Sequence, residues 1–231
     1  VFDDLAIQPL ARSEDHQLEA LCVEHYRHYL AAIGECMPTA EAERTAAEAL
    51  EQFGHFQLLA ALRAGPTGVE GLNRRIASAL HEQGLIARTE GWYPGRPVML
   101  TRNDYGLWLM NGDIGITLAL ADDTGTPRTR VAFRIAGGNV RLVLPSRLTD
   151  VETVYAMTVH KAQGSEFRHA ALVLPDSANP LLTRELIYTA ITRARDHFTL
   201  LGADPRVLEN ATRKRLWRAS GLASDFSQPA V

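Results

Sequence analysis

Helical periodicity dominates the first part of the chain. Residues 14–33 carry apolar side chains at helical intervals, which predicts an amphipathic helix. A second helix is predicted from Thr39, as its N-cap, to Gly54. Neither segment carries a recognisable chemical motif, so we interpret both helices as packing elements.

A short and nearly continuous apolar run follows at residues 56–62, which is typical of a buried parallel strand. Thr67 and Glu70 have the spacing of a capping box for a third helix, which Gly84 ends. Arg63 therefore stands at the carboxyl end of a strand and close to a helix start, where an anion is favoured. The alternative for a single loop arginine is a solvated charge.

The pattern then changes from helical to alternating. Four short strands are predicted at residues 98–101, 114–120, 129–135 and 140–144, with turn sequences between them. An antiparallel meander without a helix cannot belong to a parallel sheet, so we predict an inserted small β-barrel. We expect it to expose few aromatic residues for base stacking, and its sequence does not decide between a docking module and a structural outgrowth.

The strongest candidate chemistry lies in residues 157–167, Met-Thr-Val-His-Lys-Ala-Gln-Gly-Ser-Glu-Phe. An apolar strand at residues 154–159 passes directly into polar residues around Gly164, and open α/β sheets hold ligands at the carboxyl ends of their strands. Gly164 lets a ligand approach the backbone closely. The polar side chains around it are Lys161, Gln163, Ser165 and Glu166. This set suits a phosphate or a sugar, and a solvated turn is the simpler alternative.

The remaining chain alternates strands and helices again. Strands are predicted at residues 170–174 and 198–202, and a terminal helix at residues 205–220. Between the strands, Thr183 caps a helix on which Tyr188, Ile191 and Ala194 share one face, while Arg193 and Arg195 point to different partners. We interpret Asp176 as a loop residue rather than a metal ligand. The basic group Arg213-Lys-Arg215 is interpreted as a solvated helix face.

Composition narrows the class of protein. The chain has 231 residues, of which 46% are hydrophobic and 22% charged, as in an ordinary soluble globule of one large or two small domains. Its start lacks the regions of a signal peptide and no apolar run could span a membrane, which predicts a cytoplasmic protein without membrane contact. The formal charge of −3 means that any DNA contact must come from a local patch. The absence of an initiator Met suggests a piece of a longer polypeptide, with a processed or trimmed terminus as the alternative.

Two cysteines cannot form a disulfide framework, and an intracellular chain would keep them reduced. Cys22, His25 and His28 are spaced by three, but no fourth ligand stands at a standard zinc spacing. We therefore predict no metal site.

Two stretches resemble helicase motifs. Residues 158–167 resemble motif V of superfamily 1 helicases, and residues 188–195, Tyr-Thr-Ala-Ile-Thr-Arg-Ala-Arg, resemble motif VI. Within that superfamily the chain is most similar to the RecD family, the alpha subunits of exodeoxyribonuclease V, across roughly residues 50–222. Further similar segments follow in the family's order at residues 56–66, 68–73, 95–99, 111–115 and 184–188.

The resemblance implies a fold and a division of the chain. We expect an α/β fold: a RecA-like parallel sheet with flanking helices, the second motor domain, interrupted by a barrel of the Src-homology type. The expected parts are residues 1–96 and 151–231 for the motor domain and 97–150 for the barrel. The chain has no P-loop, no strand ending in Asp-Glu and no Gly-Asp-x-x-Gln. ATP and Mg²⁺ would be held mainly by a first RecA-like domain of the same polypeptide, so we expect this part alone to be inactive.

The resemblance also implies roles for single residues. Arg193 is expected to be an arginine finger for the γ-phosphate, with Arg63, as in motif IV, beside it. Gln163, Gly164 and Glu166 would approach the nucleotide, Glu166 through the ribose hydroxyls. Thr158, His160 and Lys161 would face the DNA backbone. Arg63, Glu166 and Arg193 are therefore expected to line one rim of the sheet.

The implied activity is 5′-to-3′ DNA unwinding in double-strand-break repair and recombination, on single-stranded DNA and with RecB-like and RecC-like subunits. One alternative is the helicase part of a conjugative relaxase or a stand-alone RecD-like helicase. Another is a non-catalytic docking module with vestigial motor motifs.

Overall fold

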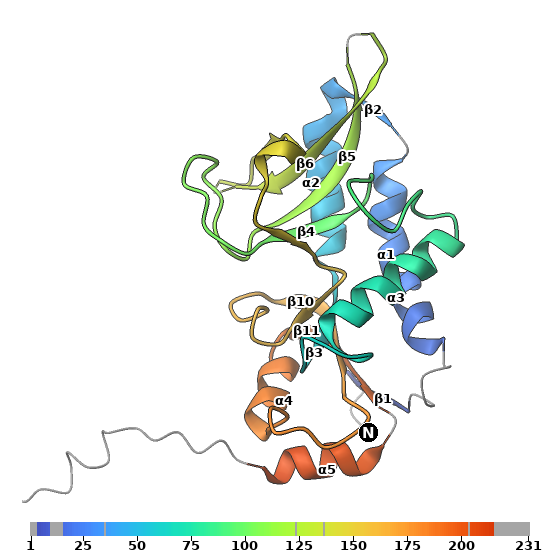
Figure 1. Ribbon diagram of the computed structural model, residues 1–231, viewed down its shortest axis with the longest axis vertical. Helices are drawn as coiled ribbons and strands as arrows, with labels where there is room; N and C mark the ends of the chain where they lie inside the picture. Colours follow the sequence, from blue (N-terminus) through green and yellow to red (C-terminus); the bar gives the residue numbers. More distant parts are fainter. Residues whose placement is uncertain are drawn as a thin grey trace, which may run out of the picture.

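A computed structural model describes residues 4–9, 16–34, 36–122, 124–135, 137–202 and 204–214. Two sheets lie one above the other along the long axis, with helices beside and below them (Figure 1). One sheet is parallel and five-stranded in the described residues, and the other is mainly antiparallel. The mixed α/β class expected from the sequence is thus confirmed.

The parallel sheet forms the lower half of the molecule in Figure 1. Its strands, in spatial order, are β1 (Leu5–Pro9), β11 (Ala194–Gly202), β10 (Phe167–Val173), β3 (Phe56–Ala60) and β9 (Ala156–Thr158). Each residue of β3 is buried, as predicted from the apolar run. The strands predicted near residues 170 and 198 are also confirmed, although both begin earlier than expected. Strand β1 was not predicted.

The second sheet lies above the first. Its strands are β7 (Val140–Val143), β6 (Pro127–Arg134), β5 (Ile114–Ala121), β4 (Pro97–Leu100) and β8 (Val151–Thr153), with β2 (Met37–Pro38) beside β5. The four predicted meander strands are confirmed. Closure into a barrel is not, since no ladder joins β7 to β8 among the residues that the structure describes.

Both faces of the second sheet contribute side chains to hydrophobic clusters. Alternate residues of a strand point to opposite faces. Val98 and Leu100 accordingly join a small cluster with Leu107, whereas Met99 between them joins the main core of the molecule. Helix α2 (Ala42–Phe53) packs on the main-core side, against β5, β6 and β7.

In the described part of the chain, four further helices surround the sheets: α1 (Gln17–Ile33), α3 (Val69–Glu82), α4 (Arg184–Ile191) and α5 (Pro205–Arg213). A 3-10 turn, Thr39–Glu41, precedes α2, and another, Pro145–Arg147, follows β7. Helix α1 packs against α2, α3 and β3 and therefore covers the junction of the two sheets. The predicted extension of α5 beyond Lys214 lies outside the described residues.

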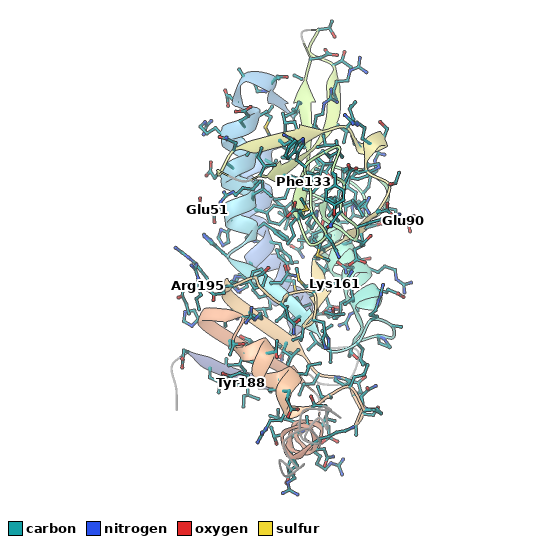
Figure 2. The ribbon with its side chains drawn as sticks, turned by 90° about the vertical axis from the view of Figure 1, so that its left-hand side faces the viewer. Glu51, Glu90, Phe133, Lys161, Tyr188 and Arg195 are labelled. Atoms are coloured by element: carbon teal, nitrogen blue, oxygen red, sulfur yellow. The ribbon has the colours of Figure 1, made fainter. Side chains whose placement is uncertain are left out.

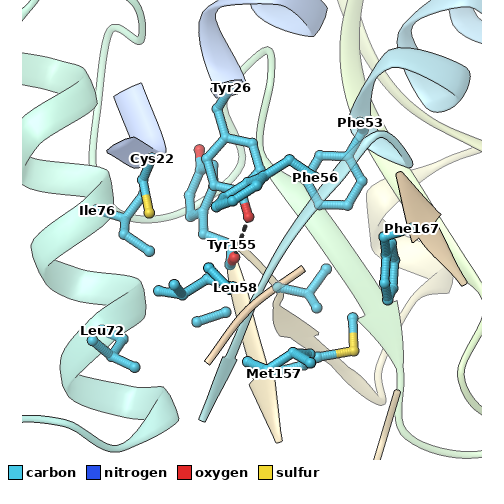
Figure 3. Close-up of a cluster of buried hydrophobic side chains, with 14 of the residues drawn as sticks. Cys22, Tyr26, Phe53, Phe56, Leu58, Leu72, Ile76, Tyr155, Met157 and Phe167 are labelled. Atoms are coloured by element: carbon cyan, nitrogen blue, oxygen red, sulfur yellow. Dashed lines mark hydrogen bonds between the residues drawn. The ribbon is translucent and has the colours of Figure 1, made fainter. Parts of the chain in front are cut away.

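Buried tyrosines join the elements at this junction. The Tyr26 hydroxyl of α1 donates a hydrogen bond to the Tyr155 carbonyl, just before β9 (Figure 3). The Tyr29 hydroxyl donates to the Gly95 carbonyl over 2.8 Å, and the hydroxyls of Tyr93 and Tyr155 are 3.2 Å apart. Burial raises the pKa of Tyr26, Tyr29 and Tyr155, so these hydroxyls stay protonated and can donate.

Two predicted helix caps are wrong. The Thr39 hydroxyl donates to the Ala121 carbonyl over 2.7 Å, and α2 begins only at Ala42. Gly68, not Thr67, precedes α3, and no side chain caps that helix. Its first N–H groups are already satisfied, because the amides of Val69 and Glu70 donate to carbonyls of the preceding loop at 3.0 and 3.1 Å. The predicted Thr183 cap is confirmed by a 3.3 Å hydrogen bond from the Leu186 amide.

The predicted apolar face of α4 is also wrong. The helix ends at Ile191, and Ala194 belongs to β11. Tyr188 is 68% exposed and points outward (Figure 2), while Leu186 and Ile187 face the core. Leu186, Ile187 and Ala190 are the buried residues of α4, which packs against β10 and β11. Arg193 therefore lies in the turn between α4 and β11 rather than on a helix.

No helix among the described residues is both long and apolar enough to cross a bilayer. Cys22 is in the core and Cys36 is exposed, and both are free thiols. The ring of His25 stacks on Phe56 at 4.3 Å between centroids, and no group of metal-ligating side chains is found in the part of the chain that the structure describes.

A histidine pair links α1 to the parallel sheet. His169 Nδ1 lies 3.0 Å from His25 Nε2, and His169 Nε2 lies 2.8 Å from the Thr199 hydroxyl. Burial, with the neighbouring His25 and His197, lowers the pKa of His169 from 6.5 to about 4. The unfolded chain therefore takes up a proton below pH 6.5 that the folded state accepts only near pH 4, so stability is lost as the pH falls through this window.

Replacing His169 should reduce this pH dependence. We expect the melting temperature of His169→Gln to fall less steeply than that of the wild type between pH 7 and pH 5, as measured by thermal unfolding. The exposed His16 provides the control, since His16→Gln should keep the wild-type slope. Equal slopes for His169→Gln and the wild type would contradict the assignment.

Candidate functional site

The connection between β9 and β10, residues 159–166, carries most of the predicted site and is named the crossing loop here. Strands β9 and β10 are both parallel to β3, which separates them. Thr158 is in register with Ala60 at the carboxyl ends of the strands, whereas Phe167 is in register with Ala194 at the amino ends. The crossing loop must therefore run from the carboxyl ends of the parallel strands, one edge of the sheet, to their amino ends, the opposite edge.

Local hydrogen bonds give the crossing loop a defined shape. The Val159 amide extends the ladder to the Ala60 carbonyl over 3.1 Å, and the amides of Lys161 and Ala162 donate to the Thr158 carbonyl over 3.0 and 3.2 Å. Val159 and Ala162 are buried and anchor this turn. Gly164 then takes a φ of +90°, which other residues rarely adopt. The exposed positions of the loop are His160, Gln163, Gly164, Ser165 and Glu166.

Arg193 fixes the loop at the amino-end edge. Its Nη1 donates to the Ser165 carbonyl over 2.9 Å, its Nε to the Thr189 carbonyl over 3.2 Å and its Nη2 to the Thr192 hydroxyl over 3.3 Å. The Phe167 amide donates back to the Arg193 carbonyl over 2.8 Å. A guanidinium has five N–H groups, so one on each terminal nitrogen remains for a ligand. The motif V-like and motif VI-like segments are thus in direct contact.

A second group of polar side chains lies at the carboxyl-end edge. Thr158 is buried at the end of β9, Lys161 is partly buried and His160 is exposed. Lys161 Nζ donates to Glu152 Oε1 on β8, which links the crossing loop to the second sheet (Figure 2 shows Lys161 near this junction). The sequence analysis missed Glu152, because a three-residue strand gives too short a pattern to recognise.

Arg63 belongs to this second group and not to that of Arg193. It follows the carboxyl end of β3 and lines a groove of about 670 Å³ with His160 and Lys161. A smaller cavity of about 260 Å³ joins Arg63 to Thr158, Lys161 and the start of α3. The expectation that Arg63, Glu166 and Arg193 line one rim is therefore wrong. Parallel strands separate the two edges by the length of β10, roughly 20 Å.

The glycine-rich loop after Arg63 has a packing explanation. A Cβ on Gly68 would lie 2.3 Å from the Ala64 carbonyl oxygen, and a Cβ on Gly71 would lie 2.5 Å from that of Gly65. These glycines allow the loop to fold tightly onto the first turn of α3. The backbone amides at this helix start donate hydrogen bonds within that turn, as described above for Val69 and Glu70.

Three residues that were predicted to lie outside the site, Asp176, Arg213 and Lys214, also have defined positions. Asp176 is exposed in the loop after β10. Lys214 Nζ donates to the Pro180 carbonyl over 3.0 Å, and Arg213 pairs with Glu209 over 2.6 Å. Arg215 lies outside the described residues. The described members of this basic group thus make contacts within the C-terminal helical region.

Comparisons with known proteins match the same stretch. The family model described as UvrD-like helicase C-terminal domain covers residues 153–201, from the last residue of β8 through the crossing loop to β11. The RecBCD enzyme subunit RecD of Haemophilus influenzae is 40% identical over 217 residues, 90% of this chain and 32% of that protein. The chain is therefore RecD-related.

The RecD-related chain also matches a second kind of relative. The ATP-dependent RecD2 DNA helicase of Deinococcus radiodurans is 36% identical over 171 residues, 73% of this chain and 23% of that protein. The chain spans about a third or less of the length of these relatives. Among solved structures, a Pif1 helicase from Bacteroides in complex with ADP-AlF3 and ssDNA gives a TM-score of 0.43 at 16% identity, over 91% of this chain and 53% of that one.

Proposed function

We propose that this RecD-related chain is the second motor lobe of an ATP-dependent DNA helicase. One observation carries the proposal: the crossing loop is bonded to Arg193 at one edge of the parallel sheet and presents Lys161 at the other. A nucleotide at the first edge and a DNA strand at the second would thus contact the same short segment.

At the amino-end edge, Arg193 is proposed to act as an arginine finger. Its guanidinium is held in place by three hydrogen bonds and keeps N–H groups on both terminal nitrogens, which suits the two oxygens of a phosphoryl group. An arginine stays charged at all physiological pH values and can neutralise charge developing on the γ-phosphoryl group. Gln163, Gly164 and Glu166 are exposed on the loop beside it and are proposed nucleotide contacts.

This chain would hold only part of the nucleotide. It contains no P-loop, and the described residues form no group of carboxylates that could hold Mg²⁺. We therefore assign those contacts to a first RecA-like domain of the same polypeptide, and we expect this chain alone to hydrolyse no ATP. The chain's own contribution is to orient a phosphoryl group and to stabilise its charge.

At the carboxyl-end edge, Thr158, His160 and Lys161 are proposed to contact the DNA backbone. Arg63 lines the same groove as His160 and Lys161, so we now assign Arg63 to DNA rather than to the γ-phosphate. Glu152 pairs with Lys161. A DNA phosphate would replace this carboxylate as the partner of the Lys161 ammonium group, which can bind either anion.

Coupling between the two ligands follows from the crossing loop. A shift of Ser165 on nucleotide binding would be transmitted through one turn of backbone to Lys161, and the grip on DNA would change with the nucleotide state. Repetition of this change is the proposed basis of translocation, and the 5′-to-3′ direction is inferred from the RecD resemblance.

The proposed partners are single-stranded DNA and RecB-like and RecC-like subunits of an exodeoxyribonuclease V. We propose that the second sheet is the counterpart of the Src-homology barrel of RecD-like helicases. A stand-alone helicase is the second candidate, because the match to an enzyme named RecD2 covers 73% of the chain.

Removing the proposed finger should abolish turnover selectively. In the full-length protein, we expect Arg193→Ala to lower steady-state ATP turnover on the order of 10³-fold while leaving single-strand affinity nearly unchanged. Arg193→Lys keeps the charge without the planar fork and should also be strongly impaired. The control is Arg184→Ala, at the exposed start of α4. Normal turnover in folded Arg193→Ala would remove this residue from the site.

Lys161 and Arg63 should behave alike in DNA binding. We expect Lys161→Ala and Arg63→Ala each to lower the slope of log affinity for single-stranded DNA against log salt by about 0.7, the value for one phosphate contact. Fluorescence anisotropy titrations at several salt concentrations measure this slope. Arg74→Ala, an exposed arginine on α3, should leave it unchanged. An Arg63→Ala protein with the wild-type slope and a large loss of turnover would return Arg63 to the nucleotide.

A further inference from the structure

The loop between β4 and β5 exposes two large aromatic side chains. This segment, residues 103–111, is named the aromatic loop here and projects on the same side of the molecule as the crossing loop (Figure 1). Tyr105 is 73% and Trp108 is 74% exposed, whereas Leu107 and Leu109 between and beside them are buried in the small core below. The sequence analysis expected few exposed aromatic residues in this region. Instead, buried and exposed positions alternate along the loop, and the rings of Tyr105 and Trp108 face the solvent.

Hydrogen bonds hold the aromatic loop in one conformation. The amide of Asp104 donates to the Leu109 carbonyl over 2.8 Å, and the Leu109 amide donates back to Asp104 over 3.0 Å. The Asp104 carboxylate accepts from the Leu107 amide over 2.9 Å, and Arg141 Nη1 donates to the Leu107 carbonyl. Exposure of the aromatic rings is therefore a property of a fixed backbone and not of a loose segment.

Trp108 occupies an unfavourable backbone conformation. Its φ of +56° is the one positive value at a non-glycine position among the described residues. A glycine would adopt this conformation without strain, whereas a tryptophan does not. Strain of this kind persists where the surrounding structure enforces it, and it occurs often at ligand-binding sites. An exposed tryptophan at such a position makes no contribution to the core that would explain it.

A groove connects the aromatic loop to the crossing loop. Tyr105 lines a groove of about 760 Å³ together with Arg102 and Arg147. Thr101, Asn111, Thr149, Asp150 and Val151 line both this groove and the one that contains Arg63, His160 and Lys161. The Tyr105 hydroxyl accepts a 3.2 Å hydrogen bond from Asn103 Nδ2, which orients its ring. Cationic side chains and the Tyr105 ring thus lie along one continuous path, which the carboxylates of Asp104, Asp150 and Glu152 also line.

We propose that the aromatic loop is a stacking platform for the bases of single-stranded nucleic acid, with Tyr105 in the groove and Trp108 beyond it. The inference rests on the proposed function, since it extends the path of a strand that is gripped at Lys161. A positively charged groove with aromatic side chains on which bases can stack binds backbone and bases together without reading sequence. A rigid ring loses little conformational freedom on binding, so such a platform needs no rearrangement.

The test uses the full-length protein and an oligonucleotide with or without abasic positions. Trp108→Gly fits the left-handed backbone, so we expect a melting temperature equal to or above that of the wild type. Its Kd for single-stranded DNA should rise roughly 5- to 100-fold, with the salt slope unchanged because no phosphate contact is lost. Tyr105→Ala should also weaken binding, and Tyr105→Phe should weaken it less because the ring is kept.

The abasic oligonucleotide separates stacking from other effects. The wild type should bind the abasic oligonucleotide more weakly than the intact one. Trp108→Gly should bind the abasic oligonucleotide with the same Kd as the wild type. Unchanged Kd values for folded Trp108→Gly and Tyr105→Ala would overturn the stacking platform, while a lower salt slope in Lys161→Ala would still support the motor assignment. Loss of RecB-like and RecC-like subunits from Trp108→Gly at unchanged DNA affinity would identify a protein-docking loop instead. A wild-type protein that binds no single-stranded DNA would overturn both proposals.

Discussion

The direction of two strands determines where the chemistry of this protein lies. Strands β9 and β10 run parallel with β3 between them, so the crossing loop has to return from the carboxyl ends of the strands to the amino ends. Lys161, near the beginning of the loop, consequently lies at the carboxyl ends of the strands. Ser165, near the end of the loop, lies toward the amino ends. A reversed strand would have placed both groups on one edge and removed the link between them.

Contacts between the two sheets keep this arrangement in place. The buried tyrosine cluster ties α1 to the backbone just before β9, and the ion pair between Lys161 and Glu152 ties the crossing loop to β8. Since β8 is followed directly by Val154, Tyr155 and then β9, a very short connection joins the two sheets. The second sheet therefore contacts the crossing loop both through the chain and through the Lys161–Glu152 pair.

Much of this organisation could be predicted from the sequence. Apolar runs identified the central parallel strands, and alternation identified four strands of the second sheet. The strand order could not be predicted, because nothing in a local pattern says which strands are neighbours. The error at Arg63 has another cause: Arg63 follows β3 whereas Arg193 precedes β11, so the two residues lie at opposite ends of the parallel strands. The Thr39 cap failed because its hydroxyl bonds to the Ala121 carbonyl of β5, and the Thr67 cap failed because carbonyls of the adjoining loop accept from the first amides of α3.

Lengthening the crossing loop tests the proposed coupling most directly. Two glycines inserted between Gln163 and Gly164 of the full-length protein leave both ends of the loop intact, and the control carries the same insertion at Gly125, in the exposed turn between β5 and β6. The measured quantity is the ratio of single-strand Kd values with and without a non-hydrolysable ATP analogue. We predict a wild-type ratio roughly 5- to 150-fold from unity and a ratio near unity for the insertion, with each ligand still bound separately. An insertion variant that retains the wild-type ratio would contradict coupling through this loop.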